Sequence, residues 1–360
     1  MGTPPFMDLG RSQERRALAR RRRRRRQRAF VAAGVATAVA VAVFLGVIFV
    51  GGNSEPRGAP RVGTHHAPQP RATLSADGLP LAAPAFALTG VTTPQLDPVH
   101  LAFAQPPRSG LLFNLNTGQV LWERDPHKRV RIASLTKMMT ALLTVKNTTP
   151  DEPVRITRRA ADMPGSKVGV LPVGHHVRVE TLLYGLLLPS GNDAAVALAE
   201  HVSRRVSTFV RRMNSEAAGL GMGCTRYSSP SGYYNQGNFS CAADLALLAH
   251  EDIVQPRIAR VTRTLSAELP FPIKGGKLFL YNNNPLLIYH YPGTTGLKTG
   301  FTEEAGRCLV GTAERDGVRL GVVILHSTEP GRQARALLNA GFEDVYHLKP
   351  VPEQEFPPGA

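Results

Sequence analysis

The chain has 360 residues, 42% of them hydrophobic, enough to bury the core of one large domain or two modest ones. Its formal net charge is +16, yet residues 1–28 hold eleven arginines against two acidic residues, so nine of those charges sit in one tail. This confinement argues against a basic surface on a folded domain, and we expect no nucleic-acid partner.

An uncharged apolar segment follows the arginine-rich tail. Residues 29–50, AFVAAGVATAVAVAVFLGVIFV, are long enough to cross a bilayer as a helix. Arginines precede it and none follows until Arg57, which predicts a cytoplasmic N-terminus. The alternative is a cleavable signal peptide, but the run is long for one and no A-x-A site follows closely. We expect a retained single-pass anchor in the cell membrane, with the rest of the chain outside the cytoplasm.

Composition then separates a folded part from two flexible ones. Residues 51–98 are rich in Pro, Gly, Ala and Thr without apolar periodicity, which is typical of an extended, disordered spacer. Residues 346–360 have a similar character. The folded part is therefore expected at 99–345, which is one domain by its size.

The first elements expected in this domain are a hairpin and a run of helices. Apolar and polar residues alternate on either side of Asn116-Thr117-Gly118, which predicts two strands joined by a turn. Helical periodicity begins at Ser134 and continues to about Lys146. Four more helices are expected, at 180–190 with a stop at Pro189, at 192–202 with an Asn/Asp N-cap, at 207–221 and at 241–253.

The C-terminal third favours strands. GLKTGF (296–301) precedes RCLVGTAERDGVRLGVVILH (307–326), which reads as two strands joined at Asp316-Gly317. Residues 331–342 close the domain as a helix. Strands at both ends and helices between them predict an α+β fold with an antiparallel sheet and helices packed on it.

Three cysteines lie in the part expected outside the membrane, where disulfides persist. Cys224 and Cys241 bracket a turn-rich loop, TRYSSPSGYYNQGNFS, which a disulfide between them would clamp. Cys308 sits in a strand pattern and is expected to be a small buried hydrophobe. No spacing of cysteine and histidine matches a zinc site, so we expect no metal.

Three short motifs occur in a fixed order. Ser134-x-x-Lys137 opens a helix, Ser190-Gly191-Asn192 lies between two helices, and Lys298-Thr299-Gly300 is on a strand. Each motif alone is a weak signal. Their order, wide spacing and predicted structural context together indicate a catalytic site. Ser134 and Lys137 share a helix face among apolar residues, where an ammonium is costly unless it is paired or deprotonated.

The triplet resembles that of the penicillin-binding proteins and serine β-lactamases. Its surroundings resemble the serine D-alanyl-D-alanine carboxypeptidases, the low-molecular-weight penicillin-binding proteins, in ASLTKMMTALL, LLLPSGNDAAVALAE, GLKTGFTEEAGRCLVGTA and ARALLNAGF. The similarity spans about 108–345. It implies a β-lactamase/DD-peptidase-like fold with helices on both faces of the sheet, and no cofactor. Many members add a strand-rich domain and a C-terminal membrane helix; only eighteen residues follow Phe342, so we expect the N-terminal anchor to replace that helix.

The resemblance assigns the chemistry to four side chains. Ser134 would attack the carbonyl between the two terminal D-alanines of a peptidoglycan pentapeptide and form an acyl-enzyme. Lys137 would be the base, kept neutral by burial beside Lys298. Ser190 would relay the proton to the departing D-alanine, and Asn192 would hold the substrate amide and position Lys137.

The resemblance also assigns the contacts that bind the substrate. Lys298 and Thr299, followed by Gly300, would bind its free carboxylate. The backbone N–H groups of Ser134 and Phe301 would form the oxyanion hole. Arg332 would add a second positive charge for the carboxylate. Penicillin and other β-lactams would acylate Ser134, because the lactam amide mimics the D-Ala-D-Ala bond.

Each of these residues also has a purely structural interpretation. Ser134 could be an N-cap, Lys137 a surface lysine, Lys298 an edge-strand charge and Arg332 a surface helix charge. Ser190 and Asn192 could cap the following helix.

Other functions stay open beside the carboxypeptidase. A transpeptidase or endopeptidase would differ in the acceptor or in the bond cut, and a wall-binding scaffold would need no catalysis. A β-lactamase would need a second base to activate a deacylating water. The candidates are Glu200, Glu216, Glu251 and Glu268, whose predicted positions do not aim at the acyl bond.

Overall fold

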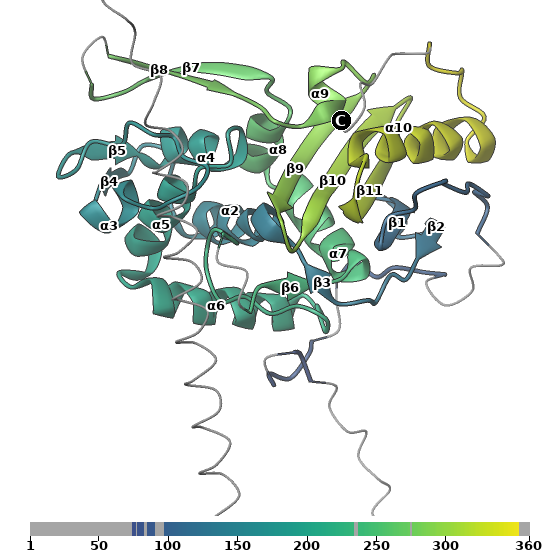
Figure 1. The fold of residues 1–360 in the computed structure, drawn as a ribbon, viewed down its shortest axis with the longest axis horizontal. Coiled ribbons are helices and arrows are strands. Elements are labelled where there is room, and N and C mark those ends of the chain that lie inside the picture. The colour runs from purple at the N-terminus through teal and green to yellow at the C-terminus, as the bar shows by residue number, and fades with distance from the viewer. Residues whose placement is uncertain are drawn as a thin grey trace, which may run out of the picture. The chain divides into compact units, whose positions relative to one another are not determined.

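The computed structural model describes residues 74–76, 78–82, 85–90, 97–233, 237–273 and 276–352 (Figure 1). The expected arginine-rich tail and membrane anchor lie outside these residues. Within them, no helix combines the length and the apolar character needed to cross a membrane.

A five-stranded antiparallel sheet is the framework of the described domain. Its strand order is β2-β1-β11-β10-β9. The strands are β1 (Ser109–Asn114), β2 (Val120–Arg124), β9 (Thr294–Thr302), β10 (Gly306–Arg315) and β11 (Val318–Ser327). The hairpin near the start of the domain thus pairs with the strands at its end, and Leu112 faces Val322 across β1 and β11.

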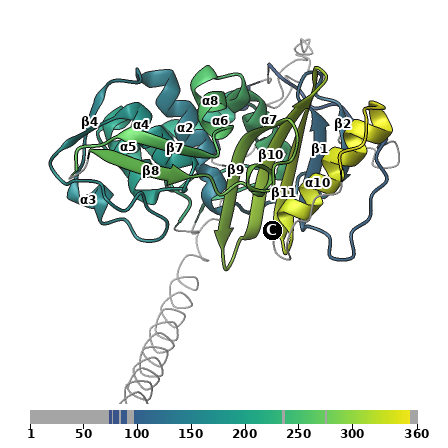
Figure 2. The same cartoon turned by 90° about the horizontal axis from the view of Figure 1, so that it is seen from above.

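Both faces of this sheet are buried. Successive side chains of a strand point to opposite faces, so neighbouring residues of β1 enter different apolar clusters. Leu111 and Phe113 of β1 belong to one apolar cluster, which includes α7 (Ala242–Ile253). Leu112 belongs to another cluster with α10 (Pro330–Ala340). Figure 2 shows these two helices on opposite sides of the sheet. The expected arrangement of helices on both faces is therefore confirmed.

The second part of the domain is helical and is built around α2 (Thr136–Asn147), which continues from the short 3₁₀ turn η2 (Ala133–Leu135). The first nine residues of α2 are buried, so neighbours surround it almost completely. Those neighbours are α4 (Val179–Leu187), α5 (Asn192–Ser203), α6 (Val206–Gly219), α7 and α8 (Pro256–Thr262).

Short elements complete the described chain. They are β3 (Val130–Arg131), β4 (Pro153–Arg155), α3 (Arg158–Ala161), β5 (His176–Arg178), β6 (Phe239–Ser240), β7 (Ser266–Pro270), β8 (Lys277–Tyr281), α9 (Pro285–Ile288) and the π-helical turn η3 (Gly341–Val345). The helices expected in the middle of the chain are present, with ends that differ by a few residues.

Two predicted segments differ from the structure. Part of the expected spacer packs on the domain: the Phe86 ring stacks on His250 with centroids 3.9 Å apart, and Thr89 N–H donates to Gly118 O at 2.9 Å. At the other end, the hydroxyl of Tyr346 accepts a hydrogen bond from Asn114 Nδ2 at 2.6 Å. Single aromatic anchors in a Pro- and Gly-rich segment leave no periodicity, so composition alone did not reveal them.

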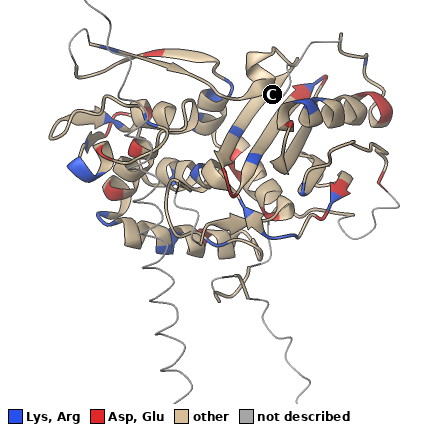
Figure 3. Ribbon diagram, in the orientation of Figure 1, with Lys and Arg blue, Asp and Glu red and all other residues tan. Residues whose placement is uncertain are grey.

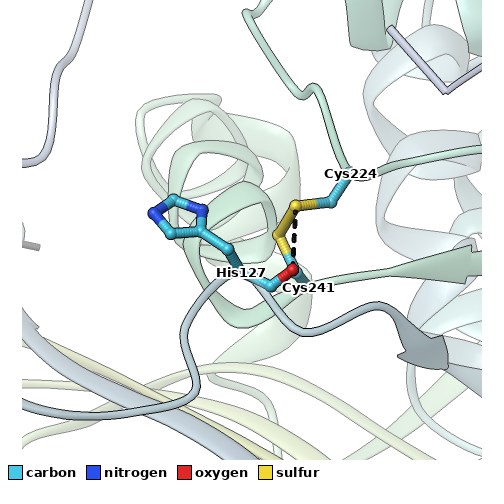
Figure 4. Close-up of side chains that lie close together, drawn as sticks. All are labelled: His127, Cys224 and Cys241. Carbon is cyan, nitrogen blue, oxygen red and sulfur yellow. Dashed lines mark hydrogen bonds between the residues drawn. A yellow bond between two sulfur atoms is a disulfide. The ribbon is translucent and has the colours of Figure 1, made fainter. Parts of the chain in front are cut away.

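The cysteines lie as predicted. Cys224 and Cys241 form a disulfide, with Cα atoms 5.7 Å apart, and Figure 4 shows it beside His127. Cys308 is a buried free cysteine, and burial raises the pKa of its thiol to about 12. The disulfide therefore closes the loop between β6 and the chain that follows α6, while Cys308 stays a protonated, apolar side chain.

Charged residues of both signs are interspersed along the described helices and strands (Figure 3). Several of them pair: Glu180 binds Arg257 at 3.0 Å and Arg260 at 2.6 Å. Such pairs place opposite charges next to one another.

Candidate active site

Lys137 is the buried centre of the site. Its side chain is fully buried in the first turn of α2, and Nζ lies 2.8 Å from Ser134 Oγ. Nζ also donates to Asn192 Oδ1 and to the backbone oxygen of Ser231, each at 2.8 Å. Three polar partners make burial of this group tolerable, and a surface role for the lysine is excluded.

Burial also changes the protonation of both lysines at the site. It lowers the pKa of Lys137 well below its ordinary value, and the charge of Lys298 lowers it further, while Asp193 opposes the shift. Burial lowers the pKa of Lys298 to about 7. Neutral Lys137 is thus the favoured state beside a Lys298 that can still carry a charge near neutral pH.

Ser134 sits at a point of backbone strain just before α2. The preceding residue, Ala133, has a φ of +47°, a conformation that costs a non-glycine residue on the order of 1–3 kcal/mol. The N-cap of α2 is Leu135, and no side chain caps the helix. Ser134 is therefore not the capping serine of this helix, and its hydroxyl is turned toward Lys137.

Ser190 lies in the turn between α4 and α5, and Asn192 is the first residue of α5. Ser190 has a φ of +68°, and its Oγ is buried with no hydrogen-bond partner among the described residues. Asn192 Nδ2 donates to Pro164 O at 2.7 Å, which orients Oδ1 toward Lys137. The N-cap of α5 is Gly191, and no side chain makes a capping hydrogen bond. The alternative that Ser190 or Asn192 caps this helix is therefore wrong.

Asp193 is a supporting residue that sequence reasoning did not single out. Its carboxylate accepts from the backbone N–H groups of Val168 at 2.9 Å and Gly169 at 3.0 Å. These bonds hold the segment that contains Ser166, Val168 and Gly169 against α5. The backbone oxygen of Ser166 also accepts from Asn192 N–H at 2.7 Å. The SGN motif thus extends into the following aspartate, which anchors the wall of the site.

The edge strand β9 approaches the start of α2 closely. A Cβ added to Gly300 would lie 3.0 Å from Ile132 O and 3.1 Å from Ser134 N. Only glycine allows this approach without displacement of the helix start. Because β9 is the outermost strand of the sheet, part of its backbone is not used in the ladder and can face the site. The strand therefore brings Gly300 against Ser134, and Phe301 lines the same cleft as Ser134; the oxyanion hole formed by their two backbone N–H groups stays a prediction.

A cleft of about 390 Å³ opens over these residues. Its lining includes Ser134 and Ser190 together with Thr299, Gly300 and Phe301. Lys137, Asn192 and Lys298 are buried side chains that do not line it. The structure thus brings the three motifs together: Ser134, Ser190 and Thr299 contribute to the lining, although Ser190 Oγ itself is buried, and the side chains of Lys137 and Lys298 are buried.

One arginine that sequence reasoning did not single out lies at the cleft. Arg307 of β10, which pairs with Phe301 in the strand register, lines the cleft. Arg332 borders a neighbouring hollow and lies 3.6 Å from Glu329, and its contact with the substrate carboxylate stays a prediction. The register of the β9–β10 hairpin, which follows from the short connection after the KTG motif, is the signal that could have pointed to Arg307.

Acidic and metal-ligating residues do not converge on this cleft. None of the described residues that line it is acidic. The four glutamates considered above contact residues elsewhere: Glu200 with Thr157, Glu216 with Lys146, Glu251 with His250, and Glu268 with Lys277. His127, Cys224 and Cys241 are close enough together to hold an ion, but the disulfide leaves neither sulfur available as a thiolate ligand.

Comparison with known proteins places this geometry in a family. The family model described as D-alanyl-D-alanine carboxypeptidase, peptidase family S11, matches residues 103–329. The D-alanyl-D-alanine carboxypeptidase DacF of Bacillus subtilis is 34% identical over 256 residues, which cover 69% of this chain and 65% of the relative. The D-alanyl-D-alanine endopeptidase of Pseudomonas aeruginosa is 34% identical over 218 residues, 60% of this chain and 70% of the relative.

The solved structures agree. The crystal structure of the Streptomyces K15 DD-transpeptidase matches with a TM-score of 0.63 at 32% identity, and the match covers 68% of this chain and 99% of that one. The matched family model covers more than half of the chain and contains all three motifs. This chain therefore belongs to the D-alanyl-D-alanine carboxypeptidase family of serine hydrolases.

Proposed function

We propose that the protein is a membrane-anchored serine D-alanyl-D-alanine carboxypeptidase that removes the terminal D-alanine from peptidoglycan stem peptides. The observation that carries the proposal is the contact of buried Lys137 with Ser134 at 2.8 Å, beside a second buried lysine. Because burial also lowers the pKa of Lys137 well below its ordinary value, this pairing gives a serine hydroxyl a base, which a structural lysine would not need.

The reaction follows from the positions of four groups. Lys137 Nζ takes the proton of Ser134 Oγ as that oxygen bonds to the carbonyl carbon between the two D-alanines. The carbonyl oxygen becomes an oxyanion that accepts from the N–H groups of Ser134 and Phe301. Collapse breaks the C–N bond, and the proton returns from Lys137 through Ser190 Oγ to the departing amine. Water then cleaves the ester and restores Ser134.

Three residues suit recognition of a free chain end. Lys298 lies beneath the cleft, and Thr299 and Arg307 line it. A carboxylate placed among these groups would make charge-assisted hydrogen bonds, which an internal peptide bond cannot make. Selection of the terminal residue thus comes from the positive charge at the cleft.

Transfer to an amine is the second candidate function. A solved structure that matches this chain is that of a DD-transpeptidase, and one relative is an endopeptidase. All three activities share the acyl-enzyme and differ in what attacks it or in which bond was cut. Addition of a glycine-ended acceptor peptide to the assay separates transfer from hydrolysis by its product.

The first prediction tests the nucleophile. The full chain in detergent should release D-alanine from a pentapeptide that ends in D-Ala-D-Ala, and Ser134→Ala should lower this release by about three orders of magnitude or more. Ser166→Ala is the matched control, because Ser166 lines the same cleft outside the three motifs and contacts Asn192 through its backbone. Release that survives in Ser134→Ala would remove the proposed role.

A second prediction separates this activity from that of a β-lactamase. Labelled penicillin should acylate Ser134 and stay bound through denaturing electrophoresis, because no acidic residue among the described lining of the cleft can activate a water over the ester. Ser134→Ala should carry no label, whereas Ser166→Ala should. Rapid turnover of penicillin without a trapped adduct would favour the β-lactamase.

The third prediction concerns pH. Since burial lowers the pKa of Lys298 to about 7, this lysine loses its charge as the pH rises above that value. The ratio kcat/KM should therefore fall above pH 7, through a higher KM, for a substrate with a free carboxylate. The same peptide ending in an amide should lack this alkaline limb. An identical alkaline limb for both peptides would show that another group titrates.

The proposed anchor has its own test. The apolar run at 29–50, preceded by eleven arginines, supports a retained membrane helix with the enzyme outside the cytoplasm. Protein purified from membranes should begin near Met1, and a variant that lacks residues 1–50 should appear in the soluble fraction. A mature N-terminus between Gly51 and Pro98 would indicate cleavage instead.

A further inference from the structure

The hydrogen bonds of Lys137 define the direction of its lone pair. A neutral amine has two N–H bonds and one lone pair. Asn192 Oδ1 and Ser231 O can only accept, and each lies 2.8 Å from Nζ, so together they use both N–H bonds. The remaining partner, Ser134 Oγ, can donate its proton. The lone pair therefore points at the nucleophile only while both acceptors stay in place.

The Ser231 carbonyl is held by its neighbours against the start of α2. Pro230 O accepts from Thr140 Oγ1 at 2.7 Å, one turn beyond Lys137. Gly232 has a φ of +72°, and a Cβ there would lie 1.9 Å from Ala133 O. The chain passes so close to the helix start that glycine is required at this point.

The ends of this loop are tied together away from the site. We call residues 225–233 and 237–240 the clamped loop, since the Cys224–Cys241 disulfide joins its ends (Figure 4). Just inside the disulfide, Arg226 and Phe239 exchange both backbone hydrogen bonds, at 2.9 and 3.0 Å. Asn238 then binds the opposite limb through both ends of its amide, at 3.0 and 2.8 Å. A continuous series of contacts thus links the disulfide to Ser231.

We propose that the clamped loop is a positioning element for the catalytic base: the Ser231 carbonyl aims the lone pair of Lys137 at Ser134, and the Cys224–Cys241 disulfide keeps that carbonyl in place. The inference rests on the proposed function, because it concerns the acylation of Ser134. It goes beyond the three motifs, none of which includes a residue of this loop.

Reduction of the disulfide should loosen this arrangement. A dithiol reductant exchanges with the disulfide, so that its own two thiols become a disulfide and both cysteines become thiols. Cys224 is half-buried and can be reached, whereas Cys241 is buried. Without the covalent closure, open states of the loop gain conformational entropy and admit water to Lys137. Since burial is the main cause of the low pKa of Lys137, hydration should raise that pKa.

Charged groups on neighbouring elements act on Lys137 or contact the ends of this loop. Lys298 on β9 and Asp193 on α5 act on Lys137 with opposite effects. Asp244 on α7 accepts from Cys224 N–H at 2.8 Å, and burial raises its pKa to about 6. Because reduction acts next to the Asp244 contact, a variant that disturbs the loop while the disulfide stays intact is also needed.

The test measures the rate of acylation by a fluorescent penicillin, as a function of pH, for the full chain in detergent. We expect the acid limb of the reduced protein to move to higher pH by about one unit, so that the rate on that limb falls about tenfold. Reoxidation should restore the original profile. Gly232→Ala, which keeps the disulfide but pushes Ser231 away from the helix start, should shift the limb in the same direction without reductant.

Gly118→Ala is the matched control. Gly118 also has a positive φ, +78°, and a Cβ there would lie 2.0 Å from Ala87 O, but it belongs to the β1–β2 hairpin. This variant should lose thermal stability while its acid limb and its sensitivity to reductant stay unchanged. If reduction and Gly232→Ala lower only the melting temperature, the loop is structural and this proposal is wrong. If the oxidised protein is not acylated at all, the proposed function fails as well.

Discussion

The burial of one ammonium group is the constraint on which the rest of the site depends. Lys137 has no exposed surface, and its charged form would lose the hydration that water gives it. A second lysine, Lys298, is buried on the facing strand and repels the same charge. The domain therefore holds Lys137 as an amine, and an amine next to a serine hydroxyl is a base. Burial here serves chemistry at a cost in stability.

That constraint requires several distant segments to meet at one nitrogen. The partners of Lys137 Nζ come from η2, from the start of α5 and from the clamped loop, while β9 supplies the neighbouring charge. Such convergence leaves little space, and the backbone reflects it. Gly300 and Gly232 allow two chains to approach the helix start, and Ala133 and Ser190 adopt positive φ values that are unfavourable for residues with a Cβ.

The sheet and the helical part contribute different groups to the site. The five-stranded sheet, covered by α10 on one face and α7 on the other, presents its edge strand β9 to the site. The helical part supplies the nucleophile and the base from a nearly enclosed α2. The match to 99% of a Streptomyces DD-transpeptidase chain indicates that the described domain is a unit shared with that family. Arg307 and the disulfide-closed loop lie outside the three motifs.

The local sequence determined the elements and the three motifs, because periodicity and turn residues act over short distances. Ser134-x-x-Lys137 had to share a helix face, and Asp316-Gly317 had to turn the last hairpin, where both residues do adopt positive φ. The Cys224–Cys241 pairing also followed from the loop between them. Only the tertiary structure decided which groups reach the lysine and the cleft. The Ser231 carbonyl is a backbone group that every residue type carries, so no side chain indicated it. Arg307 lines the cleft because of its position in the strand register, which residue type does not set. Contacts made by backbone atoms and by register arise from long-range packing, which a local pattern does not encode.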